Sequence, residues 1–147
     1  MIYIVEDSDL KIQKIESFLL DNGYTKDQIN IYRSYQSGVQ AILKNPPDLV
    51  ILDMSIPTFD KSIDSREGRA RPLGGYDVMK KILFKQINTK VIVLTQLEFF
   101  GEGVEKISFE QLKTKCAENF SDIFLDCIYY SPTESSWCKS LLMYLSD

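Results

Sequence analysis

Acidic residues follow two apolar runs of this sequence, at the points where short strands would end. Glu6 and Asp7 come directly after Ile2–Val5, and Asp53 comes directly after Leu49–Leu52. In one parallel sheet these ends would share an edge, and the three carboxylates would repel one another unless a cation neutralised them. Oxygen ligands without histidine or thiolate favour Mg²⁺. A carboxylate beside Mg²⁺ can act as a nucleophile toward a phosphoryl group.

Hydroxyl residues follow two later apolar runs in the same way. Thr95 comes after residues 91–94, and Ser131 comes after residues 123–130. Phosphoryl transfer depends on positioning and electrostatic stabilisation, so a hydroxyl at Thr95 and a nearby cation would complete such a site. The chain contains no histidine. This excludes Ser-His and Cys-His nucleophile pairs, histidine-ligated zinc and a phosphohistidine on the chain itself.

Each of these residues also has a simpler interpretation. Asp53 could be a solvated carboxylate that ends a buried strand, and Thr95 could be an ordinary β-branched strand residue. Glu6 and Asp7 could be acidic residues that favour the N-terminus of a helix. The presence of all three acids at strand ends favours phosphoryl chemistry for Glu6, Asp7 and Asp53, whereas Thr95 fits either interpretation.

The hydrophobic pattern predicts the elements that would position these residues. Five apolar runs of strand length alternate with amphipathic segments at helical spacing. The strands are predicted at Ile2–Val5, Ile29–Tyr32, Leu49–Leu52, 91–94 and 123–130, and the helices at 10–20, 36–43, 76–84, 109–117 and 134–145. Ser8 or Asp9 is a suitable cap for the first helix, and Ser108 and Gln111 are spaced as a capping box for the fourth.

This alternation predicts an α/β fold, a doubly wound five-stranded parallel sheet of the flavodoxin-like type. We expect a single domain over residues 1–147, with no output domain after the last helix. The connections at residues 58–75 and 96–107 are long, and loops of that length are usually functional or mobile. In such folds the site lies beyond the carboxyl ends of the strands.

The composition narrows the class of protein. Hydrophobic residues make up 44% and charged residues 26% of the 147, as in globular proteins. A formal charge of -4 gives neither a DNA-binding surface nor a polybasic membrane patch. No signal peptide or membrane-spanning run is present, so we expect a cytoplasmic protein. The three cysteines have no metal-ligand spacing and are predicted to be reduced and mostly buried: Cys116, Cys127 and Cys138.

Four motifs, taken together, resemble the receiver domain of bacterial two-component response regulators. They are IVEDS at residues 4–8, LVILDMSIP at 49–57, GGYDV at 74–78 and VIVLT at 91–95. Each motif is weak alone, but all four occur in the order of the family. Their spacing fits once the long loop after Pro57 is allowed for, and the resemblance covers essentially the whole chain. It implies a CheY-like fold.

The resemblance also implies a role for each matched residue. Asp53 would be the phosphoacceptor. Mg²⁺ would be bound by Asp7 directly, by Glu6 directly or through water, by Asp53, and by the backbone carbonyl of Ser55. Thr95 would contact the phosphoryl group and reorient. That movement would reach the face formed by the fourth helix, the fifth strand and the fifth helix.

The chain departs from the family at the end of the fifth strand. Receivers usually carry a lysine before a proline there, where it contacts the phosphoryl oxygens, but here Ser131 precedes Pro132. A serine hydroxyl can donate a hydrogen bond but carries no charge. Lys139 is predicted to be too far away. Candidate substitutes lie in the first long loop: Arg66, Arg69 and Arg71.

The aromatic switch residue of the family also has no certain counterpart. Tyr129 and Tyr130 are both candidates, whereas an alignment on Ser131 places Ile128 at that position. All three lie in the last predicted strand, so the sequence leaves the choice open.

Two functions of different class agree with these features. The first is a stand-alone response regulator, phosphorylated by a sensor histidine kinase or phosphotransfer protein, that binds a downstream protein and has at most autophosphatase activity. It could form a homodimer through the helix-four to helix-five face. The second, favoured by the missing lysine, is a degenerate receiver that binds partners without phosphorylation. A haloacid-dehalogenase-type phosphatase fits poorly, because Ser55 stands where that family needs an acid.

Overall fold

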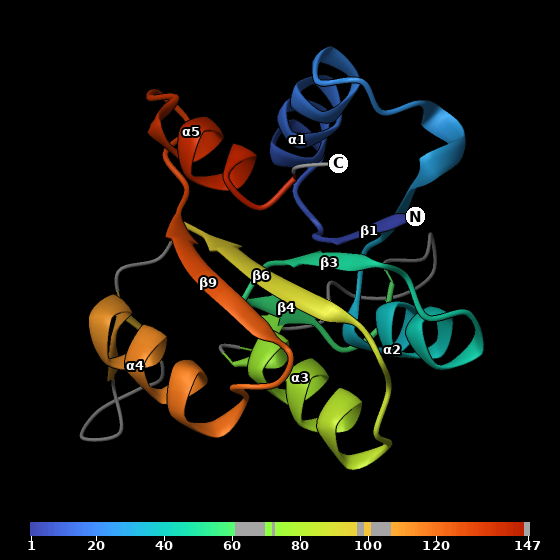
Figure 1. The fold of residues 1–147 in the computed structure, drawn as a ribbon. Helices are drawn as coiled ribbons and strands as arrows, with labels where there is room; N and C mark the ends of the chain where they lie inside the picture. Colours follow the sequence, from blue (N-terminus) through green and yellow to red (C-terminus); the bar gives the residue numbers. More distant parts are fainter. Residues whose placement is uncertain (61–69, 72, 97–98, 101–106, 146–147) are drawn as a thin grey trace.

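The fold is built on one parallel sheet. The computed structural model describes residues 1–60, 70–71, 73–96, 99–100 and 107–145. Its five-stranded sheet has the order β2-β1-β3-β6-β9, with all neighbours parallel (Figure 1). The strands are β1 (Ile2–Val5), β2 (Ile29–Tyr32), β3 (Leu49–Leu52), β6 (Lys90–Thr95) and β9 (Phe124–Tyr129). The predicted flavodoxin-like topology is therefore confirmed.

Helices cover both faces of this sheet. One face carries α1 (Asp9–Asp21) and α5 (Ser136–Leu142), and the other carries α2 (Tyr35–Lys44), α3 (Gly74–Phe84) and α4 (Phe109–Asn119) (Figure 1). A short 3₁₀ helix, Lys26–Gln28, precedes β2. Every residue of β1 and β3 is buried. Strands covered on both faces read as unbroken apolar runs, which explains why the sequence predicted these two strands correctly.

Local capping fixes where the helices begin and end. The Ser8 Oγ accepts a hydrogen bond from the Lys11 N–H (3.4 Å), so Ser8 rather than Asp9 is the cap of α1. The predicted capping box of Ser108 and Gln111 is present at α4. The last helix is shorter than the predicted 134–145, because its final residues tighten into turns closed by i to i+3 hydrogen bonds.

Each of the two long connections has a short strand near each end, and these two strands pair in an antiparallel ladder. Ile56–Pro57 (β4) pairs with Ala70–Arg71 (β5), and Phe99–Phe100 (β7) pairs with Ile107–Ser108 (β8). Two residues are too few to show strand periodicity, so the hydrophobic pattern did not predict these four short strands. The candidate substitutes Arg66 and Arg69, and the side chain of Arg71, lie outside the described residues.

Within the described part of the chain, no helix combines the length and the apolar character needed to cross a bilayer.

Candidate functional site

The strand ends bring the three predicted acids together. Val5 of β1 is paired with Leu52 of β3, and the ladder continues one residue further, since the Asp53 N–H donates to the Val5 carbonyl (3.0 Å). Glu6 and Asp53 therefore leave neighbouring strands at the same level. One carboxylate oxygen each from Glu6, Asp7 and Asp53 lie within 4.8 Å of one another. The geometric expectation behind the sequence argument is met.

Glu6 is the most constrained of the three acids. It is 2% exposed, and its Oε1 accepts hydrogen bonds from the N–H groups of Asp7 (2.9 Å) and Ser8 (3.0 Å). Its Oε2 forms an ion pair with the Lys11 Nζ at 2.6 Å. Burial raises the pKa of Glu6 to about 7, although the charge of Lys11 opposes the rise. The carboxylate is thus held in one orientation before any ligand arrives.

Lys11 is a site residue that the sequence analysis missed. Its side chain comes from α1 and is almost fully buried, and its Nζ contacts three oxygens. These are Oε2 of Glu6 (2.6 Å), Oδ1 of Asp53 (3.2 Å) and the carbonyl of Leu94 (2.6 Å). Burial lowers the pKa of Lys11, but the charges of Asp53 and Glu6 more than offset it, so the pKa is raised and the ammonium stays charged. A buried positive charge therefore lies beside Asp53.

A pattern in the sequence marks Lys11. Lys11, Ile15 and Leu19 are spaced four residues apart, so they share one face of α1, and all three are buried. A lysine in the apolar stripe of a helix must be paired or hydrogen-bonded, because an isolated buried charge is costly. The interruption of the stripe by a charged residue was the available signal.

The donor set suits a divalent ion. Oxygen-only ligands are those that Mg²⁺ prefers, and Mg²⁺ needs only a few carboxylates because it keeps several waters. With all three carboxylates ionised, the acids and the Lys11 ammonium together would carry a formal charge of two negative units. Asp7 and Asp53 are only partly buried, which leaves the cluster open to solvent on one side. Glu6, Asp7 and Asp53 are therefore a chemically suitable set of ligands.

Thr95 supplies a buried hydroxyl at the end of β6. Its side chain is fully buried, and among the described residues its Oγ1 has no hydrogen-bond partner. Its carbonyl accepts a hydrogen bond from the Tyr130 N–H (2.8 Å), which ties the ends of β6 and β9 together. Buried polar groups are nearly always satisfied, so an unpartnered hydroxyl points to a ligand or a water.

Two known proteins are similar to this chain in sequence. No protein-family profile matches the chain. It is 24% identical over 137 residues to the uncharacterized protein y4jR of Sinorhizobium fredii, covering 91% of this chain and 89% of that one. It is 21% identical over 146 residues to the Detocs response regulatory protein DtcB of Enterobacter cloacae, covering 98% and 97%.

Solved structures of response regulator receivers superpose on this chain. The response regulator TrrA of Thermotoga maritima, in complex with Mg²⁺-BeF, superposes with a TM-score of 0.63 at 18% identity, over 99% of this chain and 97% of that one. A CheY-like receiver domain from Methylobacillus flagellatus gives 0.59 at 14% identity, over 99% and 97%. This chain has the receiver fold of response regulators. The receiver fold accounts for the order of the motifs and for the position of the acids at the strand ends.

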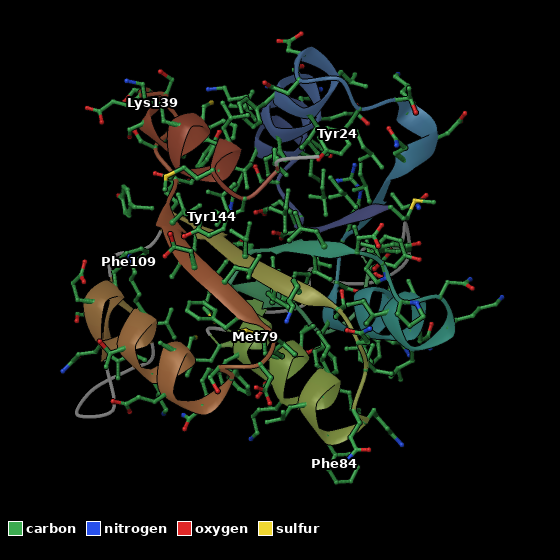
Figure 2. The ribbon with its side chains drawn as sticks, in the orientation of Figure 1. Tyr24, Met79, Phe84, Phe109, Lys139 and Tyr144 are labelled. Carbon is green, nitrogen blue, oxygen red and sulfur yellow. The ribbon has the colours of Figure 1, made fainter. Side chains whose placement is uncertain are left out.

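Ser131 and Lys139, the residues considered for the role of the family's lysine, have different surroundings. The Ser131 Oγ lies 3.2 Å from the Thr133 hydroxyl and accepts a hydrogen bond from the Thr133 N–H (3.3 Å), so it is part of a local turn. Lys139 is exposed on the outer side of α5 (Figure 2). Ser55 lies two residues beyond Asp53 and is partly buried.

The two candidate switch aromatics of the receiver differ in environment. Tyr129 is 41% exposed and packs edge-to-face against Phe109 of α4, with ring centroids 5.8 Å apart. Tyr130 is 2% exposed and lies 5.4 Å from the Trp137 ring of α5. The Lys11 Nζ lies 5.2 Å from the centroid of the Tyr130 ring. Tyr130 is therefore in contact with the acidic site, whereas Tyr129 faces α4.

Proposed function

We propose that this chain is a phosphorylation switch in which Asp53 accepts a phosphoryl group from a sensor histidine kinase or a phosphotransfer protein. Mg²⁺ would be held by Glu6, Asp7 and Asp53, together with the backbone carbonyl of Ser55. The observation that carries the proposal is the convergence of the three carboxylates within 4.8 Å on a receiver fold. Bound there, Mg²⁺ would neutralise negative charge on the carboxylates and on the incoming phosphoryl oxygens.

The chain's own residues would do the rest of the chemistry. A carboxylate oxygen of Asp53 attacks the phosphorus atom, the P–N bond of the donor phosphohistidine breaks, and its electron pair stays on the imidazole nitrogen. An acyl phosphate forms on Asp53. Glu6, already fixed by two N–H groups and Lys11, keeps the site preorganised. The unpartnered hydroxyl of Thr95 is the donor that would reach a phosphoryl oxygen.

The phosphorylated chain would act by binding another protein. The contact of Thr95 with Tyr130 offers a route from the acceptor to the face of α4, β9 and α5. A downstream protein, or a second copy of the chain, would bind that face. The acyl phosphate would persist until it is hydrolysed, and the chain itself would contribute at most an autophosphatase activity to that hydrolysis. The protein would act in the cytoplasm.

A second candidate is a receiver that binds partners without being phosphorylated. Ser131 at the place of the usual lysine favours it, since a hydroxyl brings no positive charge to the phosphoryl oxygens. The retained acids and the buried Lys11 favour the switch.

The deciding experiment is incubation with acetyl phosphate, with and without Mg²⁺, read by intact mass. We expect wild-type protein to gain one phosphoryl group only with Mg²⁺, and Asp53→Asn to gain none. Asp9→Asn is the matched control, because Asp9 is an exposed acid nearby that pairs with Arg33 outside the cluster. No modification of wild-type protein, even with a histidine kinase encoded beside its gene, would support the binding module instead.

A further inference from the structure

Lys11 places its ammonium group inside the acidic cluster. Its Nζ is buried there, between Glu6, which follows β1, and Asp53, which follows β3. A lysine ammonium has three N–H donors, and three oxygens surround this one. Two of the contacts are short, to Glu6 and to the Leu94 carbonyl at 2.6 Å each, whereas the contact with the Asp53 Oδ1 is 3.2 Å.

The two short contacts would hold the Lys11 ammonium in place, whereas the longer contact with Asp53 could be exchanged for another acceptor. The Leu94 carbonyl and Glu6 hold the ammonium in place, while the longer contact is made to the residue proposed to accept phosphate. A phosphoryl group on Asp53 would be bonded to the carboxylate that Lys11 already touches. One N–H of Lys11 can then turn from Asp53 to a phosphoryl oxygen, and the two short contacts can remain.

Other basic side chains considered for this role either contact other residues or are exposed. The Lys14 Nζ, one turn along α1, donates to the Pro132 carbonyl (2.6 Å), and Arg33 pairs with Asp9. Lys139 is exposed on α5. Ser131 stands at the position of the usual lysine, and its hydroxyl contacts Thr133. Within the described residues, the charge that reaches Asp53 comes from Lys11.

We infer that Lys11 replaces the strand-five lysine of receivers: it supplies, from the first helix, the cation that contacts the phosphoryl group on Asp53. This inference rests on the proposed function, because it assigns a partner to the phosphoryl oxygens of that site. It explains how the chain keeps Glu6, Asp7, Asp53 and Thr95 while carrying a serine at position 131. The cation has moved to another element rather than disappeared.

The test separates binding of the metal from binding of the phosphoryl group. The variants are Lys11→Met, the control Lys14→Met, and the double variant Lys11→Met with Ser131→Lys. Each is titrated with Mg²⁺ and then with beryllium fluoride in saturating Mg²⁺. The readout is the fluorescence of Trp137, the single tryptophan, which packs on Tyr130 beside Lys11.

We expect Lys11→Met to lose about 10- to 100-fold in beryllium fluoride affinity, the effect of one hydrogen bond to a charged group. Its Mg²⁺ affinity should be unchanged or higher, because a neighbouring positive charge is removed. Lys14→Met should match wild type in both titrations. The double variant should recover beryllium fluoride affinity, since a lysine returns to the position that receivers use.

A measurement on wild-type protein covers the case in which Lys11→Met does not fold. The ¹⁵N resonance of the Lys11 ammonium should shift when beryllium fluoride is added to the Mg²⁺-bound protein. Wild-type affinity for beryllium fluoride in Lys11→Met, or an unmoved Lys11 resonance, would overturn the inference and leave the proposed function intact. Loss of both ligands without recovery in the double variant would assign Lys11 a structural role only. Failure of wild-type protein to bind beryllium fluoride or to accept phosphate would overturn both proposals.

Discussion

Gly75, in the first turn of α3, offers a sharp test of how the fold positions the phosphoacceptor. Its N–H donates to the Met54 carbonyl (2.9 Å), so the start of α3 lies directly against the segment that carries Asp53. A Cβ added at Gly75 would lie 2.4 Å from the backbone oxygen of Asp53 and 3.0 Å from the Cα of Met54. Ordinary van der Waals contact begins near 3.4 Å, so the methyl group and the Asp53 oxygen would have to move apart by about 1 Å.

Both atoms that would have to move belong to the backbone, so removing the clash costs more free energy than moving a side chain would. Overpacking of this kind costs about 1–3 kcal/mol. Gly75→Ala gains part of the roughly 1 kcal/mol by which alanine favours a helix over glycine. We therefore expect the free energy of unfolding, measured in urea by Trp137 fluorescence, to fall by about 1–2 kcal/mol. Displacement of Asp53 should also weaken Mg²⁺ binding.

Gly38→Ala, in α2, is the matched control. Its added methyl group would meet the side chain of Val5 at 3.0 Å, and a side chain can yield more easily than backbone. The helix propensity gained then offsets the crowding, so we expect a stability within about 1 kcal/mol of wild type and normal Mg²⁺ affinity. If Gly75→Ala matched this control in both measurements, the close approach of α3 to Asp53 would not control the site.

Three further predictions concern the site directly. Asp7→Asn should weaken Mg²⁺ binding by at least about 10-fold, since even changes to outer-shell partners cost that much, and unchanged affinity in calorimetry would remove Asp7 from the site. Thr95→Val should be as stable as wild type or up to about 1 kcal/mol more stable, because it removes an unpartnered buried hydroxyl, yet it should bind beryllium fluoride more weakly; equal binding would exclude a phosphoryl contact for Thr95. The pKa of Glu6 is raised from 4.5 to about 7, so between these pH values and without Mg²⁺ the folded protein retains a proton that the unfolded chain releases. As pH rises through this window, the free energy of unfolding should fall and the affinity for Mg²⁺ should rise. Urea and Mg²⁺ titrations that showed the opposite trends would contradict the raised pKa.

The sequence predicted the central sheet well because burial on both faces leaves a simple signature. The bounds of β1, β2 and β3 are those predicted, at Ile2–Val5, Ile29–Tyr32 and Leu49–Leu52. The acids after β1 and β3 could be placed together before the structure was known, since parallel strands bring their carboxyl ends to one edge. The five strands of the central sheet and the five α-helices of the described residues thus followed from the hydrophobic pattern, and their order followed from the rules for parallel sheets.

The same reasoning missed the cation of the site, although Lys11 interrupts the apolar stripe of α1. The resemblance to receivers directs attention to the end of β9, where Ser131 stands, and not to a helix on the face of the sheet. Lys11 carries its charge into the site only because α1 packs so that the face shared with Ile15 and Leu19 is buried. The packing of α1 on the sheet decides which of its faces is buried. Hydrophobic periodicity predicts burial for the apolar residues of that face, but not for a lysine among them.

The most direct measurement locates the phosphoryl group on the chain. Protein incubated with acetyl phosphate and Mg²⁺ is reduced with borohydride, which converts an aspartyl phosphate to homoserine, and its peptides are sequenced by mass spectrometry. We predict homoserine at position 53, dependent on Mg²⁺. Homoserine at another acid, or a chain that is phosphorylated with Asp53 unmodified, would contradict the assignment of Asp53 as the acceptor.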